Sequence, residues 1–196
     1  MDIERTSSLK VLLEDARNRG FLYYKELARF FPSADPGGTE LDEVLSYLER
    51  AGIHILPDPD LVPEKVATKR IPPHRVNDFY IDADPLQVYL HEVAQVPHLT
   101  PEREIQLAET VAGGGPDAAR AETQLVEANL WLVVAIARHY AIPGVHMLDL
   151  LEQGNTGLMR AAHTFRHGHG YKLATYATFF VHRSLDELVS TTRNLN

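Results

Sequence analysis

One stretch of the chain is the most informative about its fold: residues 125–140, LVEANLWLVVAIARHY, followed by residues 148–160, LDLLEQGNTGLMR, and 170–178, GYKLATYAT. In its first part, apolar residues recur at the three- and four-residue spacing of a helix, and Pro143–Gly144 marks the end of the pattern. The members of this stripe are Leu125, Ala128, Leu132, Ala135 and Ile136. The pattern therefore predicts one long helix.

The two later parts predict two further helices. The apolar positions of the first of them are Leu148, Leu151, Leu158, Met159 and Ala162. Gly154 and Gly157 lower the helix propensity of this segment without interrupting its period. The sequence HGHG at residues 167–170 predicts a turn, and residues 171 to about 193 form the last helical candidate.

Two capping signals precede this stretch. Asp84–Pro85 suits a helix start, because aspartate caps free N–H groups and proline fits the first helical position. Thr100–Pro101–Glu102 repeats the same logic. Gly113–Gly115, followed by Pro116, predicts a break before the long helix.

The front of the chain predicts a small domain of three helices over residues 1–56. The first is expected from a cap at Ser8 to a stop at Gly20, and the second ends before Pro32. The third carries Leu41, Val44, Leu45 and Leu48 and is closed by Gly52, and a short extended piece follows at residues 53–56.

Residues 57–83 contain five prolines among charged residues and keep no apolar period, which predicts a flexible linker. The predicted fold class is therefore all-α: a small N-terminal three-helix domain over residues 1–56, the linker, and a helical bundle over residues 84–196. No strand ladder is expected.

Composition excludes several classes of protein. The 196 residues include no cysteine, so disulfides and thiolate metal sites are excluded. No apolar run is long enough to span a membrane, and no apolar signal core follows Met1, so a cytoplasmic protein is expected. No nucleophile–base pair or phosphate loop indicates an enzyme.

The net charge of −8 is unevenly distributed. Residues 1–60 hold 7 Lys and Arg against 12 Asp and Glu, whereas residues 121–196 hold 6 of each kind. Acidity argues against nucleic-acid binding when it is spread over the whole surface. Here it belongs to the front of the chain, so the back half is not excluded from contact with DNA.

The three quoted parts, in this order and at this spacing, resemble the polymerase-binding and promoter-melting region of bacterial primary sigma factors of the sigma-70 family. Residues 84–112 resemble the segment that precedes that region, and residues 1–56 resemble the acidic N-terminal regulatory region. The resemblance implies a helical bundle and a transcription initiation factor that is not an enzyme and needs no cofactor. It divides the bundle into an upstream segment, residues 84–112, and a docking and melting region, residues 121–196.

The resemblance implies a docking surface for core RNA polymerase, whose largest subunit offers a basic coiled coil. The docking residues would be Asp149, Leu150, Glu152, Gln153 and Asn155. Carboxylates and amides of this kind suit charge-assisted hydrogen bonds to arginine. Without the resemblance, composition alone favours a different interpretation, in which the same residues form a solvated helix face.

The resemblance also implies contact with promoter DNA, above all with the unpaired non-template strand. The residues it assigns are Phe165, Lys172, Thr175, Tyr176, Phe179, Phe180, His182 and Arg183. Aromatic faces and cations capture unstacked bases. Without the resemblance, each aromatic residue is as readily explained by core packing. Neither a membrane nor a small-molecule substrate is expected as a partner.

Several positions depart from the family pattern. Leu173 replaces a phenylalanine of the base pocket, Trp131 and Gln87 replace arginines, and Asp186 adds a negative charge on the DNA side. These changes and the histidine-bearing turn weaken the expected phosphate contacts. An alternative function is therefore a regulatory decoy that binds core polymerase without productive DNA recognition.

A metal site is the remaining rival for the histidines near the turn. His163 and His167 are four residues apart, with His169 nearby. Gly168 and Gly170 make a regular helix there improbable, and no acidic residue lies within the cluster. No metal site is predicted.

Overall fold

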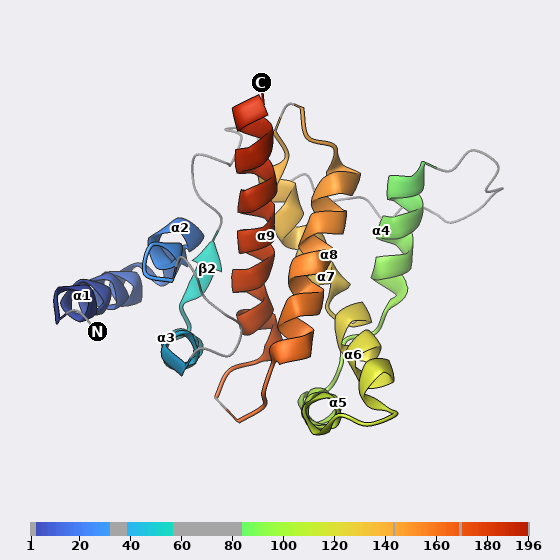
Figure 1. Ribbon diagram of the computed structural model, residues 1–196, viewed down its shortest axis with the longest axis horizontal. Helices are drawn as coiled ribbons and strands as arrows, with labels where there is room; N and C mark the ends of the chain where they lie inside the picture. The colour runs from blue at the N-terminus through green and yellow to red at the C-terminus, as the bar shows by residue number, and fades with distance from the viewer. Residues whose placement is uncertain (1–2, 32–38, 57–83, 143, 169, 196) are drawn as a thin grey trace.

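The computed structural model describes residues 3–31, 39–56, 84–142, 144–168 and 170–195 (Figure 1). The helices are α1 (Ile3–Arg19), α2 (Tyr24–Ala28), α3 (Thr39–Ala51), α4 (Pro85–Gln95), α5 (Pro101–Gly113), α6 (Ala118–Glu127), α7 (Leu130–Ala137), α8 (Met147–Thr164) and α9 (Leu173–Leu195). A 3₁₀ turn, η2 (Arg138–Tyr140), follows α7. The all-α class is confirmed, and no helix in these ranges is both long and apolar enough to cross a bilayer.

The N-terminal unit, residues 3–31 and 39–56, contains the three predicted helices and a small sheet that was not predicted. Strands β1 (Phe21–Tyr23) and β2 (His54–Leu56) pair in parallel, with Phe21 opposite His54 and Tyr23 opposite Leu56. β2 is the extended piece expected after Gly52, whereas β1 is too short to show an apolar period. Helix α1 also starts at Ile3, before the predicted cap at Ser8.

Helices α4 and α5 begin where the capping signals placed them. The Asp84 side chain accepts a hydrogen bond from the Leu86 N–H at 3.1 Å, and Thr100 accepts one from the Arg103 N–H at 3.3 Å. Helix α5 ends at Gly113, and Gly114 follows with a φ of 67°. The linker prediction, residues 57–83, lies outside the described residues.

The prediction of one long helix from the apolar stripe is wrong, because the helix is interrupted between α6 and α7. Asn129 lies at the break, and its side-chain Nδ2 donates to the Leu125 carbonyl at 2.8 Å. Its backbone N–H donates to the Val126 carbonyl, three residues earlier, instead of to the carbonyl four residues earlier, as in an α-helix. The side chain of this buried asparagine competes with backbone N–H groups for a carbonyl of the preceding turn. This competition explains why the apolar stripe continues across Asn129 while the helix does not.

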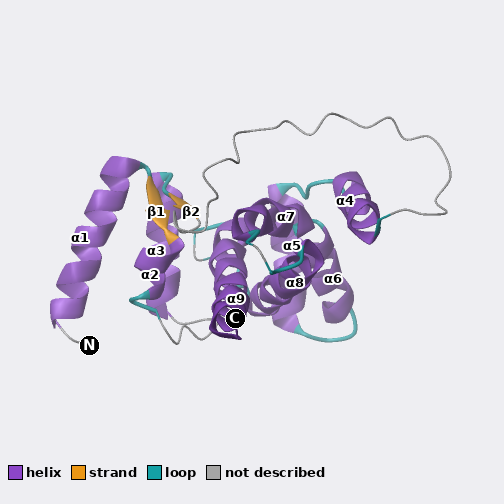
Figure 2. Ribbon diagram, turned by 90° about the horizontal axis from the view of Figure 1, so that it is seen from above, coloured by secondary structure: helices purple, strands orange, loops and turns teal. Residues whose placement is uncertain are grey.

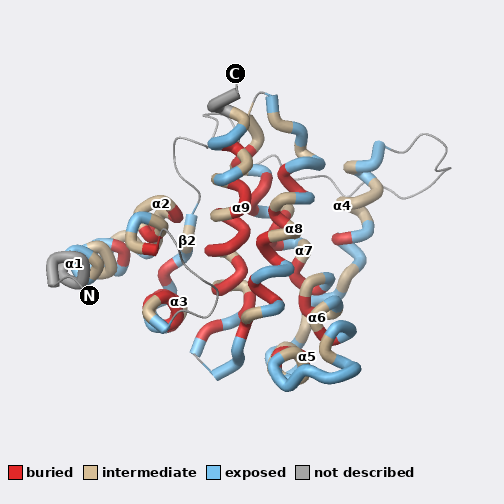
Figure 3. Tube along the Cα trace, viewed as in Figure 1, coloured by how far each residue is buried: buried red, intermediate tan, exposed pale blue. Residues whose placement is uncertain are grey.

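Helices α8 and α9 form the centre of the bundle and carry more than half of the buried residues between positions 84 and 195 (Figure 3). Their close approach depends on glycine. A Cβ placed on Gly157 would lie 2.7 Å from the Phe180 carbonyl oxygen and 2.8 Å from the Ser184 Oγ. Gly157 lowers the helix propensity of α8, but its lack of a Cβ permits the close packing of α8 on α9 that stabilises the helix.

Candidate polymerase and nucleic-acid interface

The docking residues predicted on α8 divide into a surface set and one core residue. Asp149 and Glu152 are exposed, and Gln153 and Asn155 are half-buried. Leu150 is fully buried, because it lies on the side of α8 that faces the bundle core. The polar surface at this position of α8 consequently comprises the other four residues.

A shallow hollow lies beside these residues, between α8 and α4. Its walls are Tyr89, Leu148, Leu151, Glu152, Asn155, Thr156 and Met159. Leu148 and Met159 are 43% and 47% exposed, so an apolar patch adjoins the carboxylates. The Tyr89 hydroxyl donates to the Asn155 Oδ1 at 3.2 Å and ties α4 to this surface.

Sequence reasoning assigned Leu148 and Met159 to the apolar side of a helix and missed their exposure. Their positions in the sequence could have indicated this exposure, because both flank the polar cluster that runs from Asp149 to Asn155. Tyr89 carried no comparable signal, because it lies 66 residues from its hydrogen-bond partner Asn155.

The residues predicted to contact DNA lie on α9, on the turn before it and at the end of α8, and most are buried here. Five of the eight are less than 5% exposed: Phe165, Tyr176, Phe179, Phe180 and His182. Lys172 is exposed, and Thr175 and Arg183 are half-buried. We call the segment from Phe165 to Arg183 the aromatic strip.

The rings of the aromatic strip pack against one another. Tyr176 lies 4.8 Å from Phe180 and 5.8 Å from Phe165, measured between ring centroids. Tyr171 stacks on Tyr176 at 5.8 Å with an interplanar angle of 13°. The Tyr176 hydroxyl also shares a hydrogen bond of 3.2 Å with Thr164. In this arrangement the rings form part of the hydrophobic core, which agrees with the alternative explanation of these aromatic residues by core packing.

The N-terminal unit covers the aromatic strip. Seen from above, α2, α3 and the sheet lie between α1 and α9 (Figure 2). The Tyr171 hydroxyl donates to the Asp42 Oδ1 at 2.6 Å, and the Thr175 hydroxyl donates to the Glu49 carboxylate. Farther along α9, the Tyr24 ring stacks on His182. Two acidic residues of α3 thus accept hydrogen bonds from hydroxyl groups at the start of the aromatic strip.

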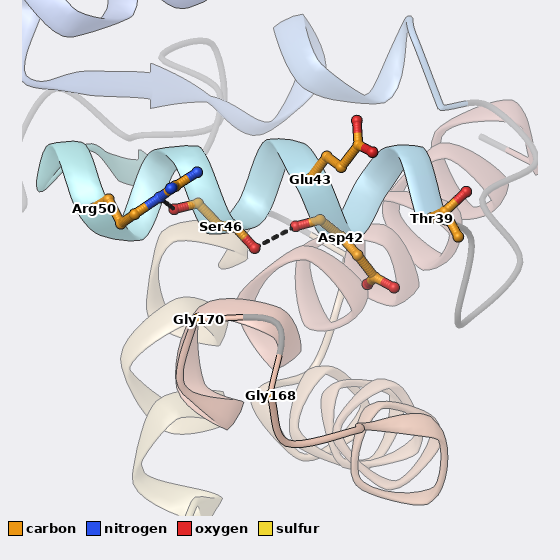
Figure 4. A pocket seen from close by; sticks show the side chains of 7 residues that line it. All are labelled: Thr39, Asp42, Glu43, Ser46, Arg50, Gly168 and Gly170. Carbon is orange, nitrogen blue, oxygen red and sulfur yellow. Dashed lines mark hydrogen bonds between the residues drawn. The ribbon is translucent and has the colours of Figure 1, made fainter.

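A second hollow lies where α3 faces the histidine-bearing turn (Figure 4). Thr39, Asp42, Glu43, Ser46 and Arg50 line it from α3, and Gly168 and Gly170 line it from the turn. The Ser46 hydroxyl donates to the Asp42 carbonyl at 2.8 Å, and the Arg50 Nε donates to the Ser46 carbonyl at 3.1 Å. The turn therefore lies against an acidic helix, where a phosphate backbone would be repelled.

His182 is held neutral by its surroundings. Burial lowers the pKa of its imidazole to about 3, and the nearby His139 acts in the same direction. The Tyr140 hydroxyl and the His182 Nδ1 share a hydrogen bond of 2.8 Å. Burial also raises the pKa of Tyr24, and burial with the Asp42 hydrogen bond raises that of Tyr171.

The positions that depart from the family pattern have different environments. Leu173 is fully buried, and its N–H donates to the Glu104 Oε1 at 3.0 Å. Trp131 is 40% exposed and meets His98 edge-on. Gln87 is exposed and Asp186 is half-buried. His163, considered above as a metal ligand, lies 3.2 Å from the Glu122 carboxylate, and the described residues hold no group of three that could bind a metal.

Three family descriptions match the chain in order. "Sigma-70 factor, region 1.1" matches residues 4–72, "Sigma-70 factor, region 1.2" matches residues 84–116, and "Sigma-70 region 2" matches residues 125–194. The first match covers the N-terminal unit except Ile3, the second covers α4 and α5, and the third covers α7, α8 and all of α9 but its last residue.

Curated relatives agree with these matches. The RNA polymerase sigma factor SigA of Clostridium acetobutylicum is 33% identical over 189 residues, which cover 95% of this chain and 48% of that protein. SigA of Listeria monocytogenes is 32% identical over 189 residues (92% and 50%), and SigA of Lactococcus lactis subsp. lactis is 36% identical over 160 residues (76% and 41%). The chain spans about half the length of these relatives. It belongs to the family of bacterial primary sigma-70 factors and carries their regions 1.1, 1.2 and 2.

Proposed function

We propose that this chain acts in transcription initiation by binding core RNA polymerase and then engaging unpaired promoter DNA. The observation that carries the proposal is the exposed face of α8, where Asp149, Glu152 and Asn155 adjoin the apolar side chains of Leu148 and Met159. A basic helical partner would find charged, amide and apolar contacts on one surface. The largest polymerase subunit, through its coiled coil, is the partner that the family implies.

The aromatic strip is the proposed DNA-binding surface, and the N-terminal unit regulates access to it. Tyr176, Phe179 and Phe180 are buried here, so they can stack on bases only after the N-terminal unit and the neighbouring side chains move. Lys172 is already exposed and would contact phosphate. No bond is made or broken in this scheme, since the energy for holding melted DNA comes from stacking and phosphate contacts.

The closed arrangement supports a regulatory role for the front of the chain. Carboxylates of Asp42 and Glu49 bind hydroxyls of Tyr171 and Thr175, at the start of the aromatic strip. DNA, which is also negatively charged, would have to compete with them. Binding to polymerase would favour DNA engagement if it stabilised the open form, because a ligand shifts an equilibrium toward the state it binds better.

Docking is tested by the binding of the full chain to core polymerase. Asp149→Ala and Gln153→Ala should each weaken binding about ten-fold, the loss of one or two charge-assisted hydrogen bonds. Glu14→Ala is the control, because Glu14 is exposed on α1, away from α8. Failure of the intact chain to bind polymerase would overturn the docking proposal.

A further inference from the structure

The sulfur chemistry of this chain is confined to three methionines, since the sequence contains no cysteine. Met159 of α8 is 47% exposed. Met147, at the start of the same helix, is half-buried and packs against the core. Met1 lies outside the described residues. A reagent in solution therefore reaches the Met159 thioether more easily than the Met147 thioether.

Met159 borders two hollows on the surface of α8. One is the hollow between α8 and α4 that adjoins the predicted docking residues, and we call it the α4 hollow. The other lies between α8 and α6, and we call it the α6 hollow. Besides Met159, the residues that line the α6 hollow are Ala119, Glu122, Thr123, Val126 and Glu127. Because both hollows are open at the same side chain, an oxidant can approach the Met159 sulfur from either side.

Hydrogen-bond donors are scarce around this sulfur. The Thr123 hydroxyl already donates to the Ala119 carbonyl at 3.0 Å, and the Thr156 hydroxyl donates to the Glu152 carbonyl at 3.2 Å. The carboxylates that line the hollows can only accept when they are ionised. Of the described side chains in the two hollows, the Asn155 amide keeps N–H groups to donate, since its oxygen accepts from Tyr89. A thioether suits these surroundings, whereas a stronger acceptor does not.

We propose that Met159 is a site of reversible oxidation by peroxide, and that the resulting sulfoxide weakens the binding of core polymerase to α8. The inference rests on the proposed function, because it assumes that the exposed face of α8 is the docking surface. It adds a redox response to that surface in a chain that has no thiol to provide one.

The oxidation is a transfer of one oxygen atom. A lone pair of the Met159 sulfur attacks one oxygen of hydrogen peroxide, so that an S–O bond forms and the O–O bond breaks. The thioether thereby loses two electrons, and the peroxide gains them. The departing hydroxide takes the proton from the transferred oxygen and leaves as water. The product is methionine sulfoxide, which is polar and chiral and is reduced again by methionine sulfoxide reductases.

The sulfoxide would oppose docking because its oxygen needs a donor. In the free chain Met159 is exposed enough for water to supply one. A partner that covers the apolar patch of Leu148 and Met159 removes this water, and the Asn155 amide is the donor that the two hollows retain. A buried acceptor without a partner is costly, so the affinity for core polymerase should fall about ten-fold or more.

The first test oxidises the full chain with hydrogen peroxide, removes the peroxide with catalase and then measures binding to core polymerase. Peptide mass spectrometry should find that Met159 gains one oxygen faster than Met147. The affinity should fall in step with the oxidised fraction of Met159. Treatment with the two reductases MsrA and MsrB, one for each sulfoxide epimer, should restore it.

Two leucine variants assign the effect to one sulfur. Met159→Leu keeps an apolar side chain of similar volume, so it should bind polymerase nearly as the unsubstituted chain does and should not respond to peroxide. Met147→Leu, the matched control on the same helix, should stay as sensitive as the unsubstituted chain. Thermal unfolding should be unchanged by oxidation, since Met159 lies on the surface rather than in the core.

The second test reverses the order of addition. When the chain is bound to core polymerase before a short exposure to peroxide, Met159 should be oxidised several-fold more slowly than in the free chain. This protection reports directly whether the partner covers the sulfur, without a substitution that could disturb the fold.

The outcomes separate this inference from the function on which it rests. If the reduced chain binds polymerase but oxidation leaves the affinity unchanged, or Met159 is not protected in the complex, the redox site is wrong and docking stands. An equal loss of affinity in oxidised Met159→Leu would also overturn the inference, because another group would then carry the effect. If the reduced, intact chain does not bind polymerase, the proposed docking itself is wrong.

Discussion

The Tyr171 hydroxyl donates a 2.6 Å hydrogen bond to the Asp42 carboxylate, which joins the turn before α9 to the N-terminal helix α3. Both residues are buried, with 7% and 6% of their surfaces exposed. A buried carboxylate needs polar partners, and the hydroxyl supplies one of them. This contact makes the position of the acidic N-terminal unit depend on the same segment that carries the aromatic strip.

Asp42→Ala should loosen the N-terminal unit. The change leaves the buried Tyr171 hydroxyl without this acceptor, which costs about 1–3 kcal/mol. Trp131 is the only tryptophan of the chain and lines a hollow with His54, Ile55 and Leu56 of the N-terminal unit. Its fluorescence emission should shift to longer wavelength when the unit moves away and water reaches the ring.

Glu43→Ala is the control for Asp42→Ala, because Glu43 is the next residue on α3 and its side chain is exposed. Its Trp131 emission should match that of the unsubstituted chain. Equal emission spectra for all three proteins would contradict a role of the Asp42–Tyr171 contact in holding the unit.

Stability should fall on acidification because of His182. Its pKa is about 3 in the folded chain and about 6.5 when exposed, so the unfolded state takes up a proton first. The contribution of this neutral imidazole is fully present above about pH 6.5 and is lost progressively as the pH falls toward 3. At pH 5.5 the free energy of unfolding should be lower by about 1 kcal/mol than at pH 7.5 from this group alone.

Urea unfolding at the two pH values measures this loss, and His182→Gln isolates it. Glutamine does not titrate, so the pH dependence of the variant should be smaller by the His182 contribution. Identical pH dependence in the two proteins would show that His182 is accessible to protons in the folded chain.

The two glycines of α8 should respond differently to alanine. At Gly157 the new Cβ would meet the Phe180 backbone oxygen, which can move only with α9. At Gly154 it would lie 2.6 Å from the Val133 Cγ1, the end of a side chain. Gly157→Ala should therefore cost about 2 kcal/mol or more from overpacking, despite the gain of up to about 1 kcal/mol in helix propensity.

Chemical denaturation of the two variants checks this order. Gly154→Ala should be the less destabilised protein, because rotation of Val133 relieves part of the clash. A Gly157→Ala protein as stable as the unsubstituted chain would mean that α8 and α9 are farther apart than described.

Tyr89 should contribute to polymerase binding through α4. Tyr89→Ala removes one wall of the hollow beside α8 and the hydroxyl that holds Asn155. Truncation of an aromatic residue at an interface typically costs more than about 1 kcal/mol, so the affinity should fall about five-fold or more. Tyr89→Phe should recover most of it, and unchanged binding by Tyr89→Ala would exclude α4 from the docking surface.

The sequence predicted the elements whose signals are local. The caps at Asp84 and Thr100 and the stops at Gly20 and Gly52 lie within a few residues of the helices that they bound. The break at Asn129 was not predicted, because the apolar stripe continues across it and only the side-chain hydrogen bond to Leu125 reveals it. Strand β1 was missed since it exists only through its pairing with β2.

The candidate site was predictable only in part, for a related reason. The polar cluster on α8 is contiguous in sequence, so spacing alone places Asp149 and Glu152 together on a surface. The His182 ring is covered by Tyr24, and Tyr171, which stacks on Tyr176, is hydrogen-bonded to Asp42; both contacts join residues more than a hundred positions apart. No local pattern reports such contacts, and the family resemblance supplied roles for these rings without their present environment.

This chain is proposed to engage unpaired DNA through the aromatic strip once core polymerase is bound. Binding of a fluorescent single-stranded promoter-like oligonucleotide to the full chain, with and without core polymerase, tests this directly. We expect weak binding by the chain alone, and tighter, salt-sensitive binding in the complex that Tyr176→Leu abolishes. Polymerase binding without any uptake of the oligonucleotide into the complex would contradict it, and would leave a decoy that occupies the polymerase without reading DNA.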